Sequence, residues 1–377
     1  MWKYYVLFNM VEGIGPKRIE KLKVHFGSLE RAWEAPPEEI RAVAGLPDTV
    51  IEGLIRARSR LRVDDELERA RRAGARIITV EHEAYPQNLR DIYDPPPVLY
   101  VKGDLAAADR AACAIVGTRR ASSYGCAVAS QFAYELAANG VTIVSGLALG
   151  VDSAAHRGAL KAGGRTIAVL GSGVDCTYPP ENSRLCREII ESGAVLSEFP
   201  MGTAPLKGNF VARNRVISGL SVACIVVEAP ERSGALITSY FAMEQGRPVF
   251  AVPGDIRRAQ SRGTHALIKD GATLANDVDE ILETIYAQLG MPLMHMPGPL
   301  RHDMVGRDPA TAGHGPIESL ILEVLDDFEP VSRDEIYERA GPHAKSGNGE
   351  IELALLNLQM SGAIRPLPGG SFVRVGS

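Results

Sequence analysis

The stretch AACAIVGTRRASSYG, residues 111–125, decides the fold class, because an apolar run leads directly into a glycine-containing turn and then a helix-like segment. Strand, tight turn and helix follow one another here as they do where a dinucleotide-binding fold carries its G-x-G-x-x-G sequence. The later glycines of that sequence are absent, and the turn instead contains two arginines and two serines, Arg119, Arg120, Ser122 and Ser123. The stretch therefore predicts a Rossmann-like strand whose ligand is contacted by cationic and hydroxyl side chains.

Short apolar runs alternate with helical segments through the rest of this region. The runs are AACAIV (111–116), VTIVSG (141–146), RTIAVLG (165–171), GAVLSEF (193–199), VACIVVEA (222–229) and PVFAVPG (248–254). Near-continuous β-branched runs separated by helices are typical of a parallel sheet covered on both faces. Right-handed crossovers then give a doubly wound order. We therefore predict the α/β class, with an extended Rossmann-like, doubly wound parallel sheet over residues 81–289.

Residues 1–80 have a helical pattern with two glycine-containing turns, in VEGIGPKRIEKLKVHFG and VAGLPDTVIEGLIRAR. Paired turns of this kind resemble the helix-hairpin-helix or SAM-like module, whose turn amides can hold a phosphate at a helix N-terminus. A helical docking domain whose glycines only close turns explains the pattern equally well, so both interpretations stay open. The proline-rich stretch that follows, residues 85–105, is expected to be an extended connector.

The C-terminal part of the chain has a different pattern. Residues 290–316 are rich in proline and glycine and lack apolar periodicity, which predicts a flexible linker. Residues 317–377 contain three amphipathic helical segments and then IRPLPGGSFVRV, a hairpin, and together these make a winged-helix domain. Its third helical segment, GEIELALLNLQM, contains Glu350 and Glu352 but no lysine or arginine, whereas a helix that enters the DNA major groove is normally basic. A contact with a partner protein, or a regulatory role, is therefore favoured for this domain.

Composition and charge exclude some classes of protein. No apolar run approaches the roughly 20 residues of a membrane helix, and the first residues lack the pattern of a secretory signal. Five cysteines without a C-x-x-C pair predict free thiols and no metal site, so we expect a cytoplasmic protein without a membrane partner. The net charge of −5 argues at face value against a nucleic-acid ligand, but an acidic excess within residues 270–330 leaves the rest of the chain basic. Net charge alone therefore decides nothing about the ligand.

Four loops that follow predicted strands combine glycine with serine, threonine or aspartate: GTRRASSYG, SGLALGVDSAAH, GSGVDCTYPPEN and EAPERSGALIT. Ligands of open parallel sheets bind at the carboxyl ends of the strands, where these loops lie. Glycine permits close approach to the backbone, and helix N-termini offer free N–H groups. The loops therefore predict a rim that binds anions such as phosphates.

The stretch LKGNFVARNRVISGLS adds charge and an aromatic ring to this rim. If it is helical from about Lys207, then Lys207, Phe210 and Arg213 stand at i, i+3 and i+6, near one face. Such a row suits single-stranded nucleic acid, because cations hold successive phosphates while the ring stacks on a base. The alternative is a core phenylalanine flanked by solvated cations. The position of the row in the same domain as Arg119 favours binding.

The turn after residue 116 also has a purely structural interpretation. Either Ser122 or Ser123 can cap the following helix, but capping does not need an arginine, so we assign Arg119 to a phosphate, which a guanidinium binds by two parallel hydrogen bonds. Asp152 and His156 could act as acid and base, yet their i, i+4 spacing is that of an ordinary helix contact. Because no nucleophile elbow, P-loop or metal-ligand spacing is present, we predict no catalytic residue.

Together these motifs resemble the DprA/Smf family of bacterial DNA-processing proteins. The resemblance runs through GTRRASSYG, SGLALGVDSAAHRGAL, AVLGSGVDCTYPPEN, SEFPMGTAP, NFVARNRVISGLS, SGALIT and EQGRPVFAVPG, almost continuously from residue 85 to about 275. It implies a single-stranded DNA-binding protein of natural transformation, with no cofactor and no catalytic activity. Such a protein protects incoming strands and loads the RecA recombinase onto them, displacing single-strand-binding protein. The resemblance also implies a homodimer formed through the Rossmann-like domain.

The resemblance assigns roles to individual residues. By motif match, Arg119 contacts a phosphate, Lys207 and Arg213 line a basic pocket, and Phe210 stacks on a base. The full expected DNA-binding set is Gly117, Thr118, Arg119, Ser122, Ser123, Gly146, Lys207, Asn209, Phe210, Arg213 and Asn214. For the dimer contact, the segment GTHALIKDG offers Leu267 and Ile268, which we expect to be exposed.

Two rival hypotheses remain. One is a Rossmann-type nucleotide-processing enzyme, such as the lysine-decarboxylase-like proteins that hydrolyse the N-glycosidic bond of nucleoside monophosphates. Those proteins share phosphate-holding loops but carry a P-G-G-x-G-T signature that VVEAPERSGALIT lacks. The other is a scaffold that only recruits a recombinase, which predicts no direct DNA binding.

Overall fold

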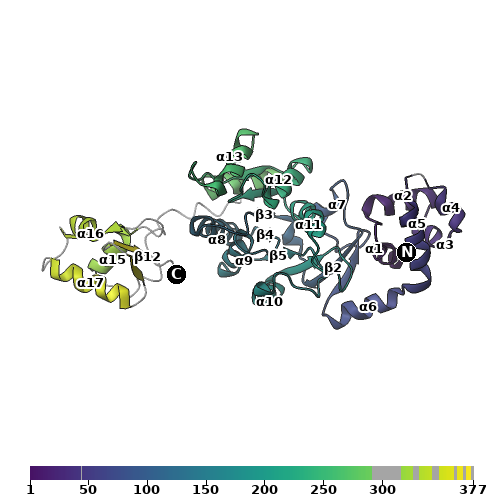
Figure 1. The fold of residues 1–377 in the computed structure, drawn as a ribbon, viewed down its shortest axis with the longest axis horizontal. Helices are drawn as coiled ribbons and strands as arrows, with labels where there is room; N and C mark the ends of the chain where they lie inside the picture. Colours follow the sequence, from purple (N-terminus) through teal and green to yellow (C-terminus); the bar gives the residue numbers. More distant parts are fainter. Residues whose placement is uncertain are drawn as a thin grey trace. The chain divides into compact units, whose positions relative to one another are not determined.

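The computed structural model describes residues 1–43, 45–290, 316–325, 331–341, 348–360, 363–367 and 371–374. The chain divides into two compact units, Met1–His295 and Met296–Ser377, whose elements are labelled in Figure 1. Each unit has a hydrophobic core of its own. The predicted linker, residues 290–316, lies almost wholly outside the described residues, so its flexibility stays a prediction.

The first unit is built on one sheet, whose described strands lie in the order β1-β2-β6-β5-β4-β3-β7-β8-β9. Their bounds are β1 (Arg76–Thr79), β2 (Val98–Gly103), β3 (Ala112–Val116), β4 (Thr142–Ser145), β5 (Thr166–Val169), β6 (Ala194–Ser197), β7 (Ala223–Val226), β8 (Val249–Ala251) and β9 (Thr273–Leu274). Neighbouring strands are parallel from β6 to β9. The chain adds β4, β5 and β6 on one side of β3 and then β7, β8 and β9 on the other. The predicted doubly wound, Rossmann-like α/β fold is confirmed.

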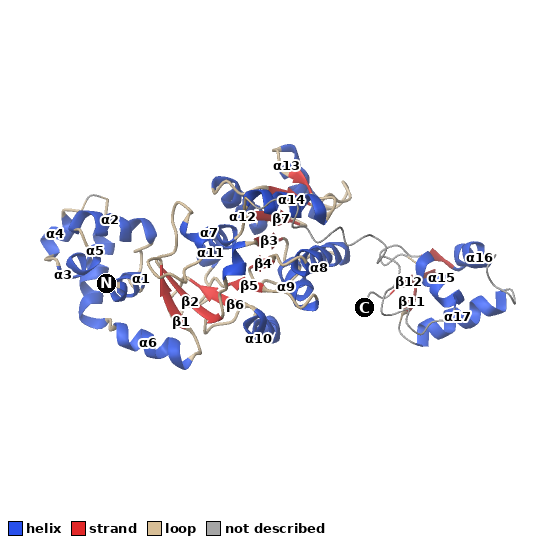
Figure 2. Ribbon diagram, turned by 180° about the vertical axis from the view of Figure 1, so that it is seen from behind, coloured by secondary structure: helices blue, strands red, loops and turns tan. Residues whose placement is uncertain are grey.

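Helices cover both faces of this sheet, as Figure 2 shows with helices in blue and strands in red. They are α7 (Gln87–Arg90), α8 (Ser123–Ala138), α9 (Val151–Lys161), α10 (Ser183–Ser192), α11 (Lys207–Leu220), α12 (Gly234–Glu244), α13 (Arg262–Lys269) and α14 (Val278–Gln288). One core cluster joins α7, α11, α12 and α13 to the central strands, through residues such as Leu89, Val216 and Leu236. The apolar strand runs are buried because both faces are covered in this way.

The segment 85–105 is not the extended connector that its prolines predict. It contains α7 and the buried strand β2, which pairs antiparallel with β6 on one side and with β1 on the other. The three prolines at 95–97 stop directly before β2, where proline removes no hydrogen bond from the interior of a sheet. The apolar run that follows them, VLYV, forms the strand, and its four residues are all buried. The adjacent prolines made this run look like part of a connector in the sequence.

The helices that precede the sheet are α1 (Trp2–Asn9), α2 (Pro16–Phe26), α3 (Leu29–Glu34), α4 (Pro37–Arg41), α5 (Asp48–Arg60) and α6 (Val63–Arg72). Gly13 and Gly45, in the turns before α2 and α5, have φ values of 78° and 77°, which residues other than glycine rarely adopt. Pro16 is the first residue of α2, where its missing N–H costs nothing. Both predicted glycine turns are therefore present, in the positions that the sequence indicates.

These helices form one body with the sheet. Tyr5 and Phe8 of α1 share a core cluster with Tyr100 of β2. The side-chain amide of Asn9 donates a 2.9 Å hydrogen bond to the carbonyl oxygen of Glu198. Residue 80, the predicted domain boundary, therefore does not separate two independent bodies, and β1, which precedes it, belongs to the sheet.

The second unit is a winged helix, as predicted. Its helices are α15 (Pro316–Val324), α16 (Arg333–Ala340) and α17 (Asn348–Met360), and its strands β10 (Val331–Ser332), β11 (Ile364–Leu367) and β12 (Ser371–Arg374) lie in the order β10-β12-β11. Ile321, Ile336, Leu355 and Phe372 are among the residues of its core. Among the helices of the described residues in both units, none is long and apolar enough to cross a bilayer.

Candidate nucleic-acid interface

The sheet reverses its winding between β3 and β7, and the loops that follow these two strands separate there. The backbone N–H of Thr118 donates a 2.7 Å hydrogen bond to the carbonyl oxygen of Glu228, which joins the two loops at their base. Beyond this bond lies a hollow of about 990 Å³, lined by residues 116–120, the N-terminal half of α11 and residues 230–238. We call it the switch-point groove. Its place is the one where open α/β sheets bind ligands.

The ring of Phe210 lies at the edge of this groove and is half-buried. The guanidinium carbon of Arg119 is 5.2 Å from the ring centroid, and the Tyr178 ring lies on another side at 5.7 Å with an interplanar angle of 46°. A Cβ at Gly171 would lie 2.8 Å from the ring, so the glycine lets the ring sit low against the sheet. The structure thus brings Arg119 and Phe210 together, as the sequence predicts, with the ring accessible.

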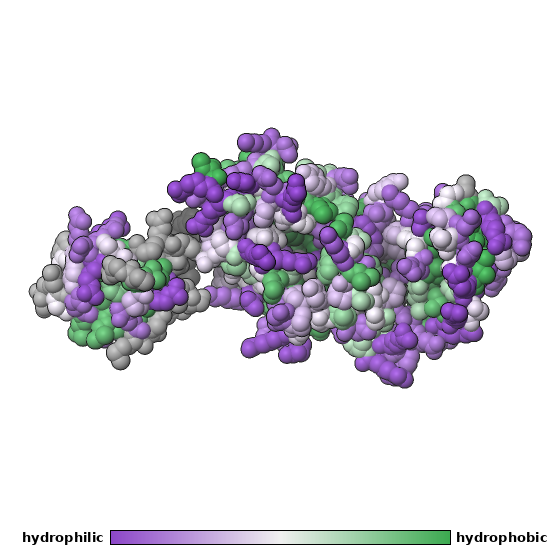
Figure 3. Space-filling model, viewed as in Figure 1, coloured by the Kyte–Doolittle hydropathy of each residue, from purple (hydrophilic) through white to green (hydrophobic). Residues whose placement is uncertain are grey.

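Positive charge on the groove comes from side chains that are free to meet a ligand. Arg119, Arg120, Lys207 and Arg232 are exposed groove residues, and none of them forms an ion pair within the described residues. Figure 3 shows hydrophilic and hydrophobic side chains next to one another over the region of α11 and α12. A surface of unpaired cations beside an aromatic ring suits a polyanion that also has flat, apolar groups.

Arg213 lines the groove, with its guanidinium carbon 6.0 Å from the Phe210 ring centroid, but it does not share the exposed helix face of Lys207, which corrects the predicted common face. It is 5% exposed and donates hydrogen bonds to the carbonyl oxygens of Gly146, at 2.7 Å, and Val169. At 100° per residue, a spacing of six turns the side chain well away from the face of Lys207, toward the sheet. Burial lowers the pKa of Arg213 to about 10, while the nearby Asp152 carboxylate favours its charged form. Arg213 therefore forms part of the groove floor.

Four further predicted residues use their polar atoms within the fold. Ser122 accepts a hydrogen bond from the Gly125 N–H at 3.1 Å, capping α8, and its hydroxyl donates to Glu228 at 2.5 Å. Asn209 donates its amide to Ala204, and Asn214 donates to Gly234. Thr118 accepts from the Arg120 N–H at 3.2 Å. These hydrogen bonds fix the loops and helix ends that border the groove, and Thr118 and Asn214 also line it.

The predicted glycines are required by packing. A Cβ at Gly117 would lie 2.4 Å from the Val151 side chain, and one at Gly146 would lie 2.5 Å from the Arg213 guanidinium. Ser123 differs, because it is exposed at the start of α8. Of the predicted set, Arg119, Ser123 and Lys207 are exposed, and Phe210 is half-buried with its ring at the edge of the groove.

Three large side chains near Phe210 were not predicted: Tyr240 lines the groove, and Tyr178 and Leu149 line a smaller hollow that adjoins it at Phe210. All three are large side chains with more than a third of their surface exposed. The signal for Tyr178 was present, because its loop, GVDCTYPPEN, follows β5 at the carboxyl edge of the sheet.

Asp152 and His156 do not form an acid–base pair. Asp152 accepts hydrogen bonds from the Gly146 and Ala148 N–H groups, and burial raises its pKa. His156 is fully buried and contacts the Thr166 hydroxyl at 2.7 Å, and burial lowers its pKa to about 3. The preference for an ordinary structural role agrees with this geometry.

Leu267 is not exposed, which corrects the prediction for the dimer contact. It is 2% exposed and belongs to the core beneath α13, while Ile268 is half-buried against the same cluster. Leu267 shares this core with Val226 of β7 and Val249 of β8. The homodimer itself stays a prediction.

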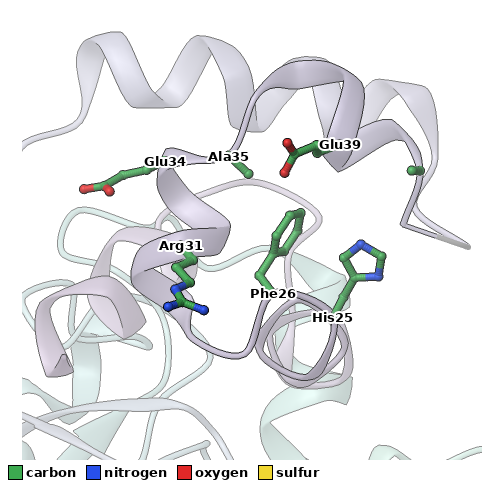
Figure 4. Close-up of a pocket in the computed structure, with 7 residues that line it drawn as sticks. His25, Phe26, Arg31, Glu34, Ala35 and Glu39 are labelled. Carbon is green, nitrogen blue, oxygen red and sulfur yellow. The ribbon is translucent and has the colours of Figure 1, made fainter.

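A second hollow, of about 570 Å³, lies among the N-terminal helices (Figure 4). His25, Phe26 and Arg31 border it together with the carboxylates of Glu34 and Glu39. Because two carboxylates share this hollow with one guanidinium, it is a poor site for a polyanion, and the switch-point groove remains the candidate.

Comparison with known proteins decides the family. A family model described as DNA recombination-mediator protein A matches residues 76–286, more than half of the chain, and one described as the DprA winged helix domain matches residues 306–370. The chain belongs to the DprA/Smf family of DNA-processing proteins. Protein Smf of Synechocystis is 34% identical over 98% of this chain and 98% of its own length. DprA of Streptococcus pneumoniae is 46% identical over 53% of this chain and 71% of its own length.

Two solved structures of DprA proteins resemble this one. That of Streptococcus pneumoniae DprA has a TM-score of 0.66 at 36% identity and covers 74% of this chain and 97% of its own. That of DNA processing protein A from Helicobacter pylori has a TM-score of 0.51 at 34% identity and covers 57% of this chain and 98% of its own. The second structure is described in terms of its protein's single-stranded DNA binding mode.

Proposed function

We propose that this protein binds single-stranded DNA in the switch-point groove, without strong sequence preference. The observation that carries the proposal is the exposed Arg119 guanidinium placed 5.2 Å from the accessible ring of Phe210, with Lys207 one helical turn before that ring on α11. The cations neutralise phosphates and the ring stacks on a base, which contributes about 1–3 kcal/mol per base. A base inside a duplex has no free face for such a ring, so single strands are preferred.

Family membership supports the finer proposal. The protein protects incoming single strands during natural transformation and loads RecA onto them as single-strand-binding protein is displaced. The family model's description as a recombination mediator supports this role, and the DNA binding described for the Helicobacter pylori protein supports the ligand. The protein acts as a homodimer in the cytoplasm, where its five free cysteines stay reduced.

A double charge reversal tests the groove. Arg119→Glu with Lys207→Glu replaces two unpaired cations by anions, so single-stranded DNA binding is lost in a gel-shift assay while thermal unfolding stays unchanged. Lys161→Glu with Arg187→Glu is the matched control, because it changes the net charge equally at exposed residues outside the groove. Unaltered binding by the folded groove variant would show that the site lies elsewhere.

Two measurements on the parent protein and the double variant distinguish the rival hypotheses. We propose that it has no catalytic role, because His156, which could act with Asp152 as acid and base, is sealed from solvent. Release of free base from nucleoside monophosphates would establish the enzyme instead. A scaffold without DNA affinity would leave both the parent and the double variant unshifted in the gel.

A further inference from the structure

Tyr93 is the most exposed large side chain of the hydrophobic and aromatic residues in the described part of the chain, at 86%. The loop that displays it is anchored on both sides of the ring. Ile92 is buried in the core, and the carbonyl oxygen of Asp94 accepts a 2.9 Å hydrogen bond from Arg215 of α11. An aromatic ring on such a fixed loop loses little conformational freedom when a ligand contacts it.

This loop lies at the same rim as the switch-point groove. β2 is antiparallel to β6, and Tyr100 of β2 pairs with Ser197, the last residue of β6, so the residues that precede β2 emerge at the carboxyl edge of the sheet. The contact of Asp94 with Arg215 places the Tyr93 loop beside α11, the helix that carries Phe210. Arg215 is about 8 Å from Phe210 along α11. A strand of several nucleotides therefore spans the interval between the rings of Phe210 and Tyr93.

The ring of Tyr93 has a cation beside it, as Phe210 has. The ammonium of Lys17, an exposed residue of α2, lies 4.6 Å from the ring centroid. The two nearest carboxylates of the loop are engaged: Asp94 pairs with Arg215 at 3.5 Å, and Asp91 accepts a hydrogen bond from Gln87 at 2.8 Å. Lys17 forms no ion pair in the described residues, so its charge is free for a phosphate.

We propose that Tyr93 and Lys17, which we call the Tyr93 platform, form a second stacking site for single-stranded nucleic acid. The strand leaves the switch-point groove along the carboxyl rim, a base stacks on Tyr93, and Lys17 contacts the adjoining phosphate. The platform rests on the proposed function, since it extends the path of the same ligand. It also joins the N-terminal helices to DNA binding through a side chain of α2 rather than through the amides of a turn.

Oligonucleotide length separates the two sites. Labelled oligothymidylates of about 3 and about 20 nucleotides are titrated by fluorescence anisotropy against the full chain, because a strand of about 3 nucleotides bound at Phe210 is too short to reach Tyr93 as well. Tyr93→Ala is expected to weaken binding of the longer strand at least roughly 5-fold, the lower end of what one stacked base contributes, and to leave the shorter strand unaffected. Tyr93→Phe, the matched control, keeps the ring and binds both strands as the parent does.

The remaining outcomes are equally decisive. Equal binding of the longer strand by Tyr93→Ala and the parent overturns the platform and leaves the groove intact. An equal loss for both lengths also overturns it, because Tyr93 then acts through the groove. Failure of the parent to bind either strand overturns the proposed function itself. Thermal unfolding of each variant serves as the control for folding. We expect the unfolding temperature to stay unchanged, because a side chain that is 86% exposed contributes little to stability.

Discussion

At the scale of single residues, the groove places an aromatic ring beside separate cations. Phe210 is supported from beneath at Gly171 and flanked by Tyr178, which leaves part of the ring open. Arg119 and Lys207 are exposed and unpaired within the described residues. The proposed stacking and charge neutralisation therefore belong to different side chains, and each can be removed alone.

Salt dependence distinguishes these two contributions. Phe210→Ala is expected to weaken single-stranded DNA binding by about 1–3 kcal/mol at every salt concentration, because a stacked base releases no counterion. Lys207→Ala is expected to lower the slope of log K against log salt by about 0.7, the value for one phosphate contact on a single strand. Anisotropy titrations from low to moderate salt measure both. A changed slope in the Phe210 variant would contradict the division of roles.

At the scale of elements, α11 connects the groove to the sheet. Its first turn presents Lys207 and Phe210, and the next turns are buried, with Arg213 joined to the carbonyl oxygens of Gly146 and Val169 at the ends of β4 and β5. The guanidinium also faces the buried carboxylate of Asp152. α11 therefore fixes the position of the Phe210 ring relative to the ends of β4 and β5.

Removing the Arg213 cation tests this connection. Arg213→Met is expected to destabilise the fold by about 3–5 kcal/mol, because it leaves Asp152 buried without its partner charge. Denaturant unfolding measures the loss. Adding Asp152→Asn to the same variant should recover part of it, since the unpaired charge is then gone. A stable single variant would show that Arg213 does not hold the strand ends.

The elements also show what sequence patterns could and could not predict. The six central strands were predictable because burial on both faces demands continuous apolar runs, and Arg119 and Phe210 were predictable because they follow from strand ends and helical spacing. β2 was missed because three prolines precede it. Arg213 was misplaced because a spacing of six residues does not return to the same helix face. The burial of Leu267 and the exposure of Tyr178 depend on packing between distant segments, which local pattern does not encode.

At the scale of the whole molecule, the switch-point groove and the winged helix belong to separate compact units. Leu353 and Leu356 of α17 are exposed, and the helix carries glutamates in place of cations. Such a surface favours a protein partner over a DNA groove.

A fragment of residues 1–290 tests this separation. It is expected to bind single-stranded DNA as the full chain does, because every groove residue lies within it. Anisotropy of fragment and full chain, side by side, measures the comparison. Loss of binding in a folded fragment would assign DNA contact to the second unit.

The union of the N-terminal helices with the sheet has a consequence for how the protein is made. Asn9 bonds to Glu198, and the buried Glu66 accepts a hydrogen bond from the Met201 N–H. A ribosome adding about 5–20 residues per second needs on the order of ten seconds between these partners. During that interval the N-terminal helices lack the hydrogen-bond partners of Asn9 and Glu66, and chaperones that bind emerging chains would meet them in this incomplete state.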